Sequence, residues 1–121
     1  MPPATGVDLD EHLAGDFVLK ELARIVQARI RRDEVFARYG GEEFAIILPE
    51  TSLEGAVALA ETLRQKVSEH LFVFQADAIR VTISVGAALL QDSDRTASDL
   101  IKRADERLYQ AKNGGRNRVC A

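Results

Sequence analysis

The chain reads VFARYGGEEFAIIL from Val35 to Leu48, two apolar runs on either side of two glycines and two acids. Apolar runs of strand length around a glycine turn are typical of a β-hairpin, so Glu42 and Glu43 are expected at its tip. Glycine lets a phosphate approach the backbone closely, and neighbouring carboxylates can bind a hard divalent cation. The hairpin therefore predicts a site for a nucleotide and a metal ion.

The composition is that of one globular domain. The 121 residues suffice for a single hydrophobic core, and 46% hydrophobic with 29% charged residues is ordinary for a soluble protein. The net charge of -3 provides no basic surface, so no nucleic acid is expected as partner. Cys120 is the only cysteine, which favours a cytoplasmic protein without disulfides. No apolar stretch approaches the roughly 20 residues of a membrane segment.

Apolar residues at helical spacing predict three amphipathic helices. They are expected from Ala14 to about Arg32, from a capping box at Thr51–Glu54 to about His70, and from Thr96 to Asn113. Residues 1–10 show no periodicity and are expected to form an irregular lead-in to a single domain over residues 11–121.

Short β-type patterns predict further strands outside the hairpin, at residues 72–74, 79–89 and 117–119. Helices and strands in this order favour an α/β (α+β) domain, with a mainly antiparallel central sheet flanked by helices. Phe44 and Tyr109 are expected in the core, and neither His12 nor His70 has metal-ligand neighbours.

Three patterns together resemble the GGDEF family, the diguanylate cyclases, in its GGEEF form. They are the hairpin segment Arg38–Phe44, the strand Val81–Gly86 of the form T-x-S-x-G, and the closing helix and turn Ala104–Asn117. The resemblance covers about residues 8–119, and the order and spacing of the patterns make chance agreement improbable. It implies a nucleotidyl-cyclase, palm-like fold.

The resemblance implies an enzyme that condenses two GTP molecules into cyclic di-GMP, a bacterial second messenger. Each protomer of an antiparallel homodimer would present one GTP to the other. Displacement of pyrophosphate from the α-phosphate suits two-metal catalysis, so Mg²⁺ or Mn²⁺ is the implied cofactor.

The same resemblance assigns roles around the hairpin. Glu42 would bind the metal, Glu43 would lie near the attacking hydroxyl, and Gly41 would let the α-phosphate approach. Each role has a simpler alternative, because acids at a turn can be merely solvated.

Three further residues match substrate-binding positions of the family. Lys112 and Arg116 would neutralise the β- and γ-phosphates, and Asp16 would accept hydrogen bonds from guanine. Cations at the end of a helix and an acid in its first turn also stabilise the helix dipole without any ligand.

The start of the chain departs from the family pattern. The family opens with a strand that carries a metal-binding aspartate, whereas this sequence begins in the loop that follows, which it matches at Asp8, His12, Gly15 and Asp16. Val7 stands where the family has a guanine-binding asparagine, and Glu11 where it has glycine. The chain is therefore expected to be N-terminally truncated, with weak or no turnover.

A missing central strand would leave unpaired backbone groups, each costing roughly 1 to 3 kcal/mol. The chain is then a fragment, or Met1–Asp10 or a partner chain fills the gap, the last as a strand-swapped dimer.

The family's inhibitory product site has the form R-x-x-D, and this chain has Arg31 and Glu34 there. Glutamate keeps the charge but moves it by one methylene, so binding of cyclic di-GMP stays open beside an ordinary helix-end pair.

Other functions stay open as well. A degenerate domain could bind GTP or cyclic di-GMP and signal through protein contacts. A cyclase or polymerase relative that uses ATP is a weaker option, which Asp16 argues against, and a protein without a nucleotide site is the last.

Overall fold

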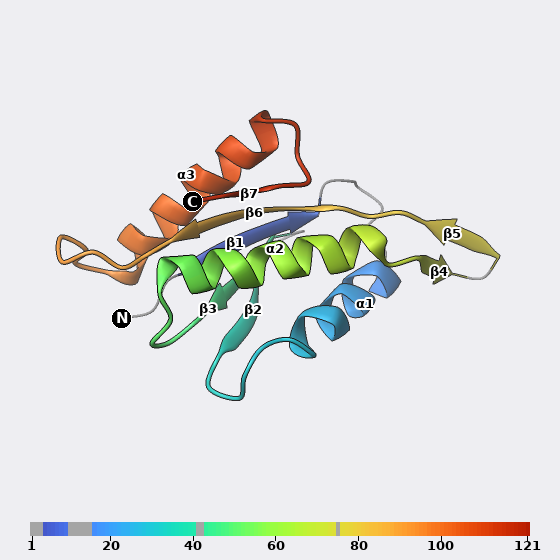
Figure 1. Cartoon of the computed structure of the whole chain (residues 1–121), viewed down its shortest axis with the longest axis horizontal. Helices are drawn as coiled ribbons and strands as arrows, with labels where there is room; N and C mark the ends of the chain where they lie inside the picture. Colours follow the sequence, from blue (N-terminus) through green and yellow to red (C-terminus); the bar gives the residue numbers. More distant parts are fainter. Residues whose placement is uncertain (1–3, 10–15, 41–42, 75) are drawn as a thin grey trace.

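The structure is a computed structural model of the chain, and it describes residues 4–9, 16–40, 43–74 and 76–121. The elements follow one another as Figure 1 traces them. They are β1 (Ala4–Leu9), α1 (Asp16–Gln27), β2 (Val35–Gly40), β3 (Glu43–Ile47), α2 (Leu53–Glu69), β4 (Phe72–Phe74), β5 (Asp77–Ile79), β6 (Ile83–Ala88), α3 (Ala97–Asn113) and β7 (Val119–Cys120). No helix of the described ranges is both long and apolar enough to cross a bilayer.

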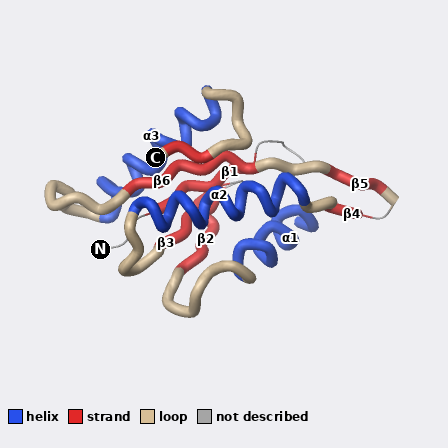
Figure 2. The backbone as a smooth tube through the Cα atoms, in the orientation of Figure 1, coloured by secondary structure: helices blue, strands red, loops and turns tan. Residues whose placement is uncertain are grey.

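Five strands form one sheet in the order β2-β3-β1-β6-β7, and β4 and β5 form a separate hairpin that projects from its end (Figure 2). Every neighbouring pair is antiparallel except β6 and β7, which are parallel. A parallel pair needs a crossover, and α3 provides it. The expected mainly antiparallel sheet is confirmed.

Helices cover both faces of this sheet. Val85 of β6 packs against α2, whereas the next residue, Gly86, lies against the backbone of α3. Successive residues of a strand point to opposite faces, so α2 and α3 lie on opposite sides, as Figure 1 also shows. The sheet is therefore the middle layer of the molecule, with α2 on one face and α3 on the other.

The first residues of the chain form the middle of the sheet. The expected irregular lead-in does not hold for Ala4–Leu9, because β1 pairs with β3 on one side and β6 on the other. Of the alternatives left open for the central position, the structure shows the chain's own first residues there. The physical reason is that β3 and β6 would otherwise expose unpaired backbone groups.

The helix predictions hold for most of their length. The helix α3 has the predicted bounds, and the Asp99 carboxylate accepts from the backbone N–H of Thr96 at 3.3 Å. The cap of α2 lies at Ser52, whose Oγ accepts from Gly55 N–H at 3.0 Å, one residue later than expected. The prediction for α1 was too long, because the helix ends at Gln27 and the basic segment follows it.

The predicted strand over residues 79–89 is two strands, β5 and β6. Between them Arg80 donates to the carbonyl oxygens of Ser68 and Glu69, at 3.4 and 3.2 Å. These carbonyls lie at the C-terminal end of α2, where helical partners are lacking. Arg80 caps α2 with its side chain, and it lies between the two strands rather than in either of them.

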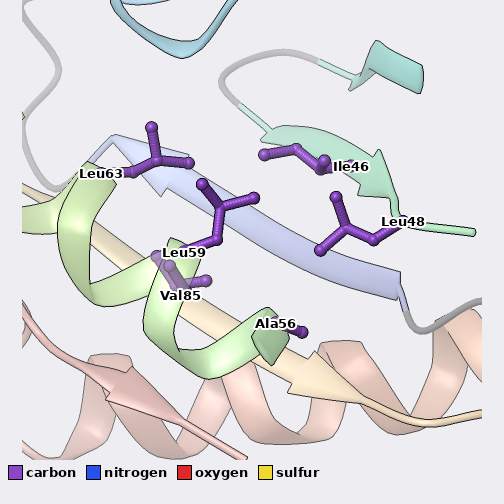
Figure 3. A pocket seen from close by; sticks show the side chains of 7 residues that line it. Ile46, Leu48, Ala56, Leu59, Leu63 and Val85 are labelled. Carbon is purple, nitrogen blue, oxygen red and sulfur yellow. The ribbon is translucent and has the colours of Figure 1, made fainter. Parts of the chain in front are cut away.

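The main core lies between α2 and the sheet. Leu59 and Leu63 of α2 face Ile46 of β3 and the following Leu48 in Figure 3. The side chains leave no room for a water molecule, so this region is packing rather than a ligand site.

Of the two aromatic residues expected in the core, one is buried. Phe44 is 5% exposed, but Tyr109 is 66% exposed, so its prediction was wrong. The buried stripe of α3 passes through Leu108, and the next residue is rotated by about 100° around the helix.

Candidate nucleotide-binding site

The strand register places several segments at one end of the sheet. Asp8 near the end of β1 lies opposite Glu43 at the start of β3 and opposite Ser84 at the start of β6. Glu43 is half-buried there, directly after the hairpin tip. Gly41 and Glu42 lie outside the described residues. The end of β1 and the beginnings of β3 and β6 therefore lie together at one end of the sheet, which we call the common edge.

The end of α3 reaches the same edge. A Cβ atom added to Gly86 would lie 2.2 Å from the backbone nitrogen of Leu108 and 2.3 Å from the carbonyl oxygen of Ala104. Because α3 returns the chain to the start of β6, Lys112 lies farther along towards Ser84. Lys112 is half-buried and the following turn is exposed.

The turn between α3 and β7 carries Arg116. Its backbone N–H donates to the carbonyl oxygen of Ala111 at 3.0 Å, and Val85 N–H donates to the carbonyl oxygen of Arg118 at 2.9 Å. These bonds attach the turn both to the helix and to the start of β6. The structure thus brings Glu43, Lys112 and Arg116 to one end of the molecule.

Asp16 is the first residue of α1 and is exposed. This helix packs mainly on α2 and β4 rather than on α3. The structure therefore shows Asp16 accessible at a helix start, without a described contact that joins it to the other candidate residues.

Comparison with known proteins decides the family. The family model described as diguanylate cyclase, GGDEF domain, matches residues 11–118. The chain belongs to the GGDEF family. Among curated relatives, Diguanylate cyclase A of Treponema denticola is 43% identical over 108 residues, which cover 89% of this chain and 29% of that protein. This GGDEF domain thus spans less than a third of that relative.

Solved GGDEF structures share the fold. The active GGEEF domain of a diguanylate cyclase from Vibrio cholerae matches with a TM-score of 0.88 at 34% identity, over 98% of this chain and 81% of that one. The GGDEF domain of DgcB from Caulobacter crescentus, in complex with c-di-GMP, matches with a TM-score of 0.92 at 30% identity, over 99% and 77%. The fold is the nucleotidyl-cyclase palm fold.

The GGDEF domain places Arg31 and Glu34 at the other end of the hairpin. They precede β2, whose six residues span about 17 Å at about 3.3 Å per residue. The Glu34 carboxylate accepts from Arg31 backbone N–H at 2.5 Å. Both residues line a shallow cavity of about 430 Å³, open to solvent, that continues to Gln27 and Phe36. This second location is separate from the common edge.

The carboxylate chemistry of the hairpin fits a hard cation such as Mg²⁺. Glu43 is among the described residues, and Asp8 holds the register position opposite it. Within the described ranges, no group of three or more His, Cys, Asp or Glu residues could hold a metal ion. Glu42 lies outside these ranges, so its part in a metal site stays a prediction.

Arg64 of α2 is not part of any of the three family patterns. Its guanidinium donates to the side-chain oxygen of Asn117, in the turn that carries Arg116, at 3.0 Å. Glu61 and Arg64 have the spacing of an ordinary ion pair within a helix, so nothing in the sequence marks a contact 53 residues away.

Proposed function

We propose that this GGDEF domain binds GTP and condenses two GTP molecules into cyclic di-GMP. The observation that carries the proposal is the common edge, where the start of β3, the end of β1 and the cationic end of α3 converge. In each of the two condensations, a ribose 3'-oxygen bonds to the α-phosphorus of the other nucleotide, and the bond to pyrophosphate breaks. The hydroxyl proton leaves with a base or water.

The side chains divide this work by charge. Lys112 and Arg116 neutralise the terminal phosphates and the pyrophosphate that leaves, since charge-assisted bonds to phosphate are strong. Glu43 lies beside the attacking hydroxyl, and Asp16 accepts from the guanine edge. Glu42 holds the metal, which when bound polarises the phosphoryl oxygens.

Two copies of the domain act together in this proposal, each presenting one GTP to the other in an antiparallel homodimer. Swapping of the first strand is not needed to complete the sheet, because β1 pairs within its own chain. In this proposal the dimer forms around the nucleotides and not by strand exchange.

We propose weak turnover for this chain. Val7 lies inside β1, opposite Phe44 and Val85, and is apolar, so it cannot supply the guanine contact of the family's asparagine. Glu11 stands where the family has glycine. Asp8, the only acidic residue of β1, is the candidate for a second metal carboxylate by its register opposite Glu43.

Incubation with GTP and Mg²⁺, with products separated by chromatography, tests this proposal. Slow formation of cyclic di-GMP that Glu42→Gln abolishes is expected, while Glu54→Gln, at an exposed acid in the first turn of α2, leaves the rate unchanged. Asp8→Asn is expected to lower the rate below that of the original chain. Binding of GTP without product would favour the non-catalytic alternative.

That alternative is a degenerate domain that binds GTP or cyclic di-GMP and signals by protein contact. It is favoured by the cavity beside Arg31 and Glu34, which is large enough for part of a nucleotide. Calorimetric titration with cyclic di-GMP tests it, and Arg31→Ala should remove the binding. Unchanged affinity in that variant would exclude this cavity.

A further inference from the structure

The turn after α3 has an unusual backbone. Gly115, Arg116 and Asn117 have φ angles of 120°, 63° and 48°. Glycine adopts positive φ readily, and asparagine tolerates it, but arginine does so at a cost. A turn of three such residues keeps its shape only if its surroundings hold it.

Part of the support comes from within the turn and from α3. Arg116 N–H donates to the carbonyl oxygen of Ala111 at 3.0 Å, and Arg118 Nε donates to the carbonyl oxygen of Arg116 at 3.1 Å. Both bonds hold the backbone of Arg116 itself. Neither one holds the side chain of the next residue, Asn117.

That side chain is held from α2. Arg64 Nη1 donates to Asn117 Oδ1 at 3.0 Å, while Arg64 Nε donates to both carboxylate oxygens of Glu61 at 2.9 and 3.0 Å. The Arg64 side chain is only 18% exposed. A planar guanidinium can make both sets of bonds at once, so Glu61 fixes the orientation in which Arg64 meets the turn.

The contact joins two layers of the molecule. The helices α2 and α3 cover opposite faces of the sheet, and β7, which the turn enters, is its edge strand. The edge strand β7 also contacts α2, and this is how Arg64 of α2 reaches the turn.

We propose that Arg64 is a positioning residue for Arg116. Through Asn117 it holds the left-handed turn in the shape that presents the Arg116 guanidinium to the terminal phosphates of GTP. This inference rests on the proposed function for the identity of the ligand, but its structural part concerns the turn alone.

Three substitutions separate positioning from general stability. Arg64→Lys keeps the charge but loses the fork that serves two partners. Asn117→Gly keeps the positive φ and removes the acceptor, whereas Asn117→Asp keeps an acceptor and tolerates the same φ. Asn117 lies in an exposed turn, so its variants stay informative if Arg64→Lys fails to fold.

Two readouts are needed. The first is amide hydrogen exchange of Arg116 and Asn117 without nucleotide, which Arg64→Lys and Asn117→Gly should accelerate. The second is calorimetric titration with GTP and with GMP in Mg²⁺. The affinity for GTP should fall about five- to tenfold, the size of a coupled contact, and that for GMP should stay the same. Asn117→Asp should keep the exchange rates of the original chain, and it is compared by exchange alone because its added negative charge would repel the phosphates of GTP.

A double-variant cycle and a matched control complete the test. In an Arg116→Ala background, Arg64→Lys should cause no further loss of GTP affinity. Arg24→Lys is the control, because Arg24 pairs with Glu21 at the same spacing in α1. It should change neither the exchange rates of the turn nor the affinity for GTP.

Unchanged exchange at Arg116 in the Arg64 and Asn117→Gly variants would overturn the inference, as would equal losses of GTP and GMP affinity. If the original chain bound neither nucleotide, the proposed function would fail. The exchange rates would then decide by themselves whether Arg64 controls the turn.

Discussion

At the residue scale, Gly86 determines how closely α3 approaches the sheet. The nearest atoms to an added Cβ would be backbone atoms of α3, which cannot rotate away as a side chain can. Because Lys112 and the turn with Arg116 follow on the same helix, this one residue also sets how α3 lies over the edge where the nucleotide is proposed to bind.

Gly86→Ala should therefore destabilise the fold by about 3 kcal/mol, the upper part of the usual range for overpacking. Urea unfolding measures the change. Gly55→Ala is the control, because a Cβ there meets only side-chain atoms of Thr51 and Ser52. Its effect should stay within about 1 kcal/mol, since alanine favours a helix. Equal stability of Gly86→Ala and the original chain would mean that α3 lies farther away.

A second residue-scale prediction concerns acid. The Arg103 guanidinium holds the pKa of the Asp94 carboxyl below its ordinary value, and a backbone N–H from Gln91 adds to this. The folded state then binds fewer protons than the unfolded chain, so this stabilisation is present above about pH 4 and is lost as the pH falls through the lowered pKa.

In Asp94→Asn, the free energy of unfolding should therefore decrease less than in the original chain as the pH is lowered from about 5 to about 2. Urea unfolding at each pH measures it. Asp92→Asn, at an exposed acid of the same loop, should keep the original slope. Parallel slopes for Asp94→Asn and the original chain would rule out this pair as a source of acid sensitivity.

At the element scale, β1 forms a central strand although its own sequence pattern does not predict one. Residues 4–9 have no strong strand pattern, yet they pair along both sides in the centre of the sheet. The helices α2 and α3 were predictable because their caps and apolar stripes are local. The break at Arg80 was not, because it depends on the end of α2.

Val7→Pro tests the central strand. Proline has no N–H to donate and is not tolerated inside a sheet, so the variant should lose about 2 to 4 kcal/mol or fail to fold. Val7→Thr keeps the N–H and a β-branched side chain, and should remain close to the original stability. Thermal unfolding followed by circular dichroism gives the comparison. A stable Val7→Pro variant would show that β1 does not pair in the centre.

At the scale of the whole molecule, the domain has two separate candidate locations for nucleotide binding. Strands β2 and β3 connect them, with the start of β3 at the common edge and the cavity near Arg31 at the opposite end. Binding at one location should therefore be measurable without the other.

Lys112→Ala should weaken GTP binding by about tenfold or more, because hydrogen bonds to charged groups contribute roughly 1.5 to 3 kcal/mol. Arg31→Ala should leave GTP affinity unchanged. Calorimetric titration of both variants gives the answer. If Arg31→Ala lost as much affinity as Lys112→Ala, GTP would bind at the cavity instead.

The sequence by itself determined the hairpin, two of the three helices, the family and the identities of the candidate site residues, since these follow from short-range spacing and motif. Tertiary structure alone decided that residues 4–9 complete the sheet, that Tyr109 is exposed and that Arg64 meets Asn117. Backbone pairing and side-chain contacts between distant segments depend on which groups remain unsatisfied after the helices and hairpin have formed, and local patterns do not contain that information.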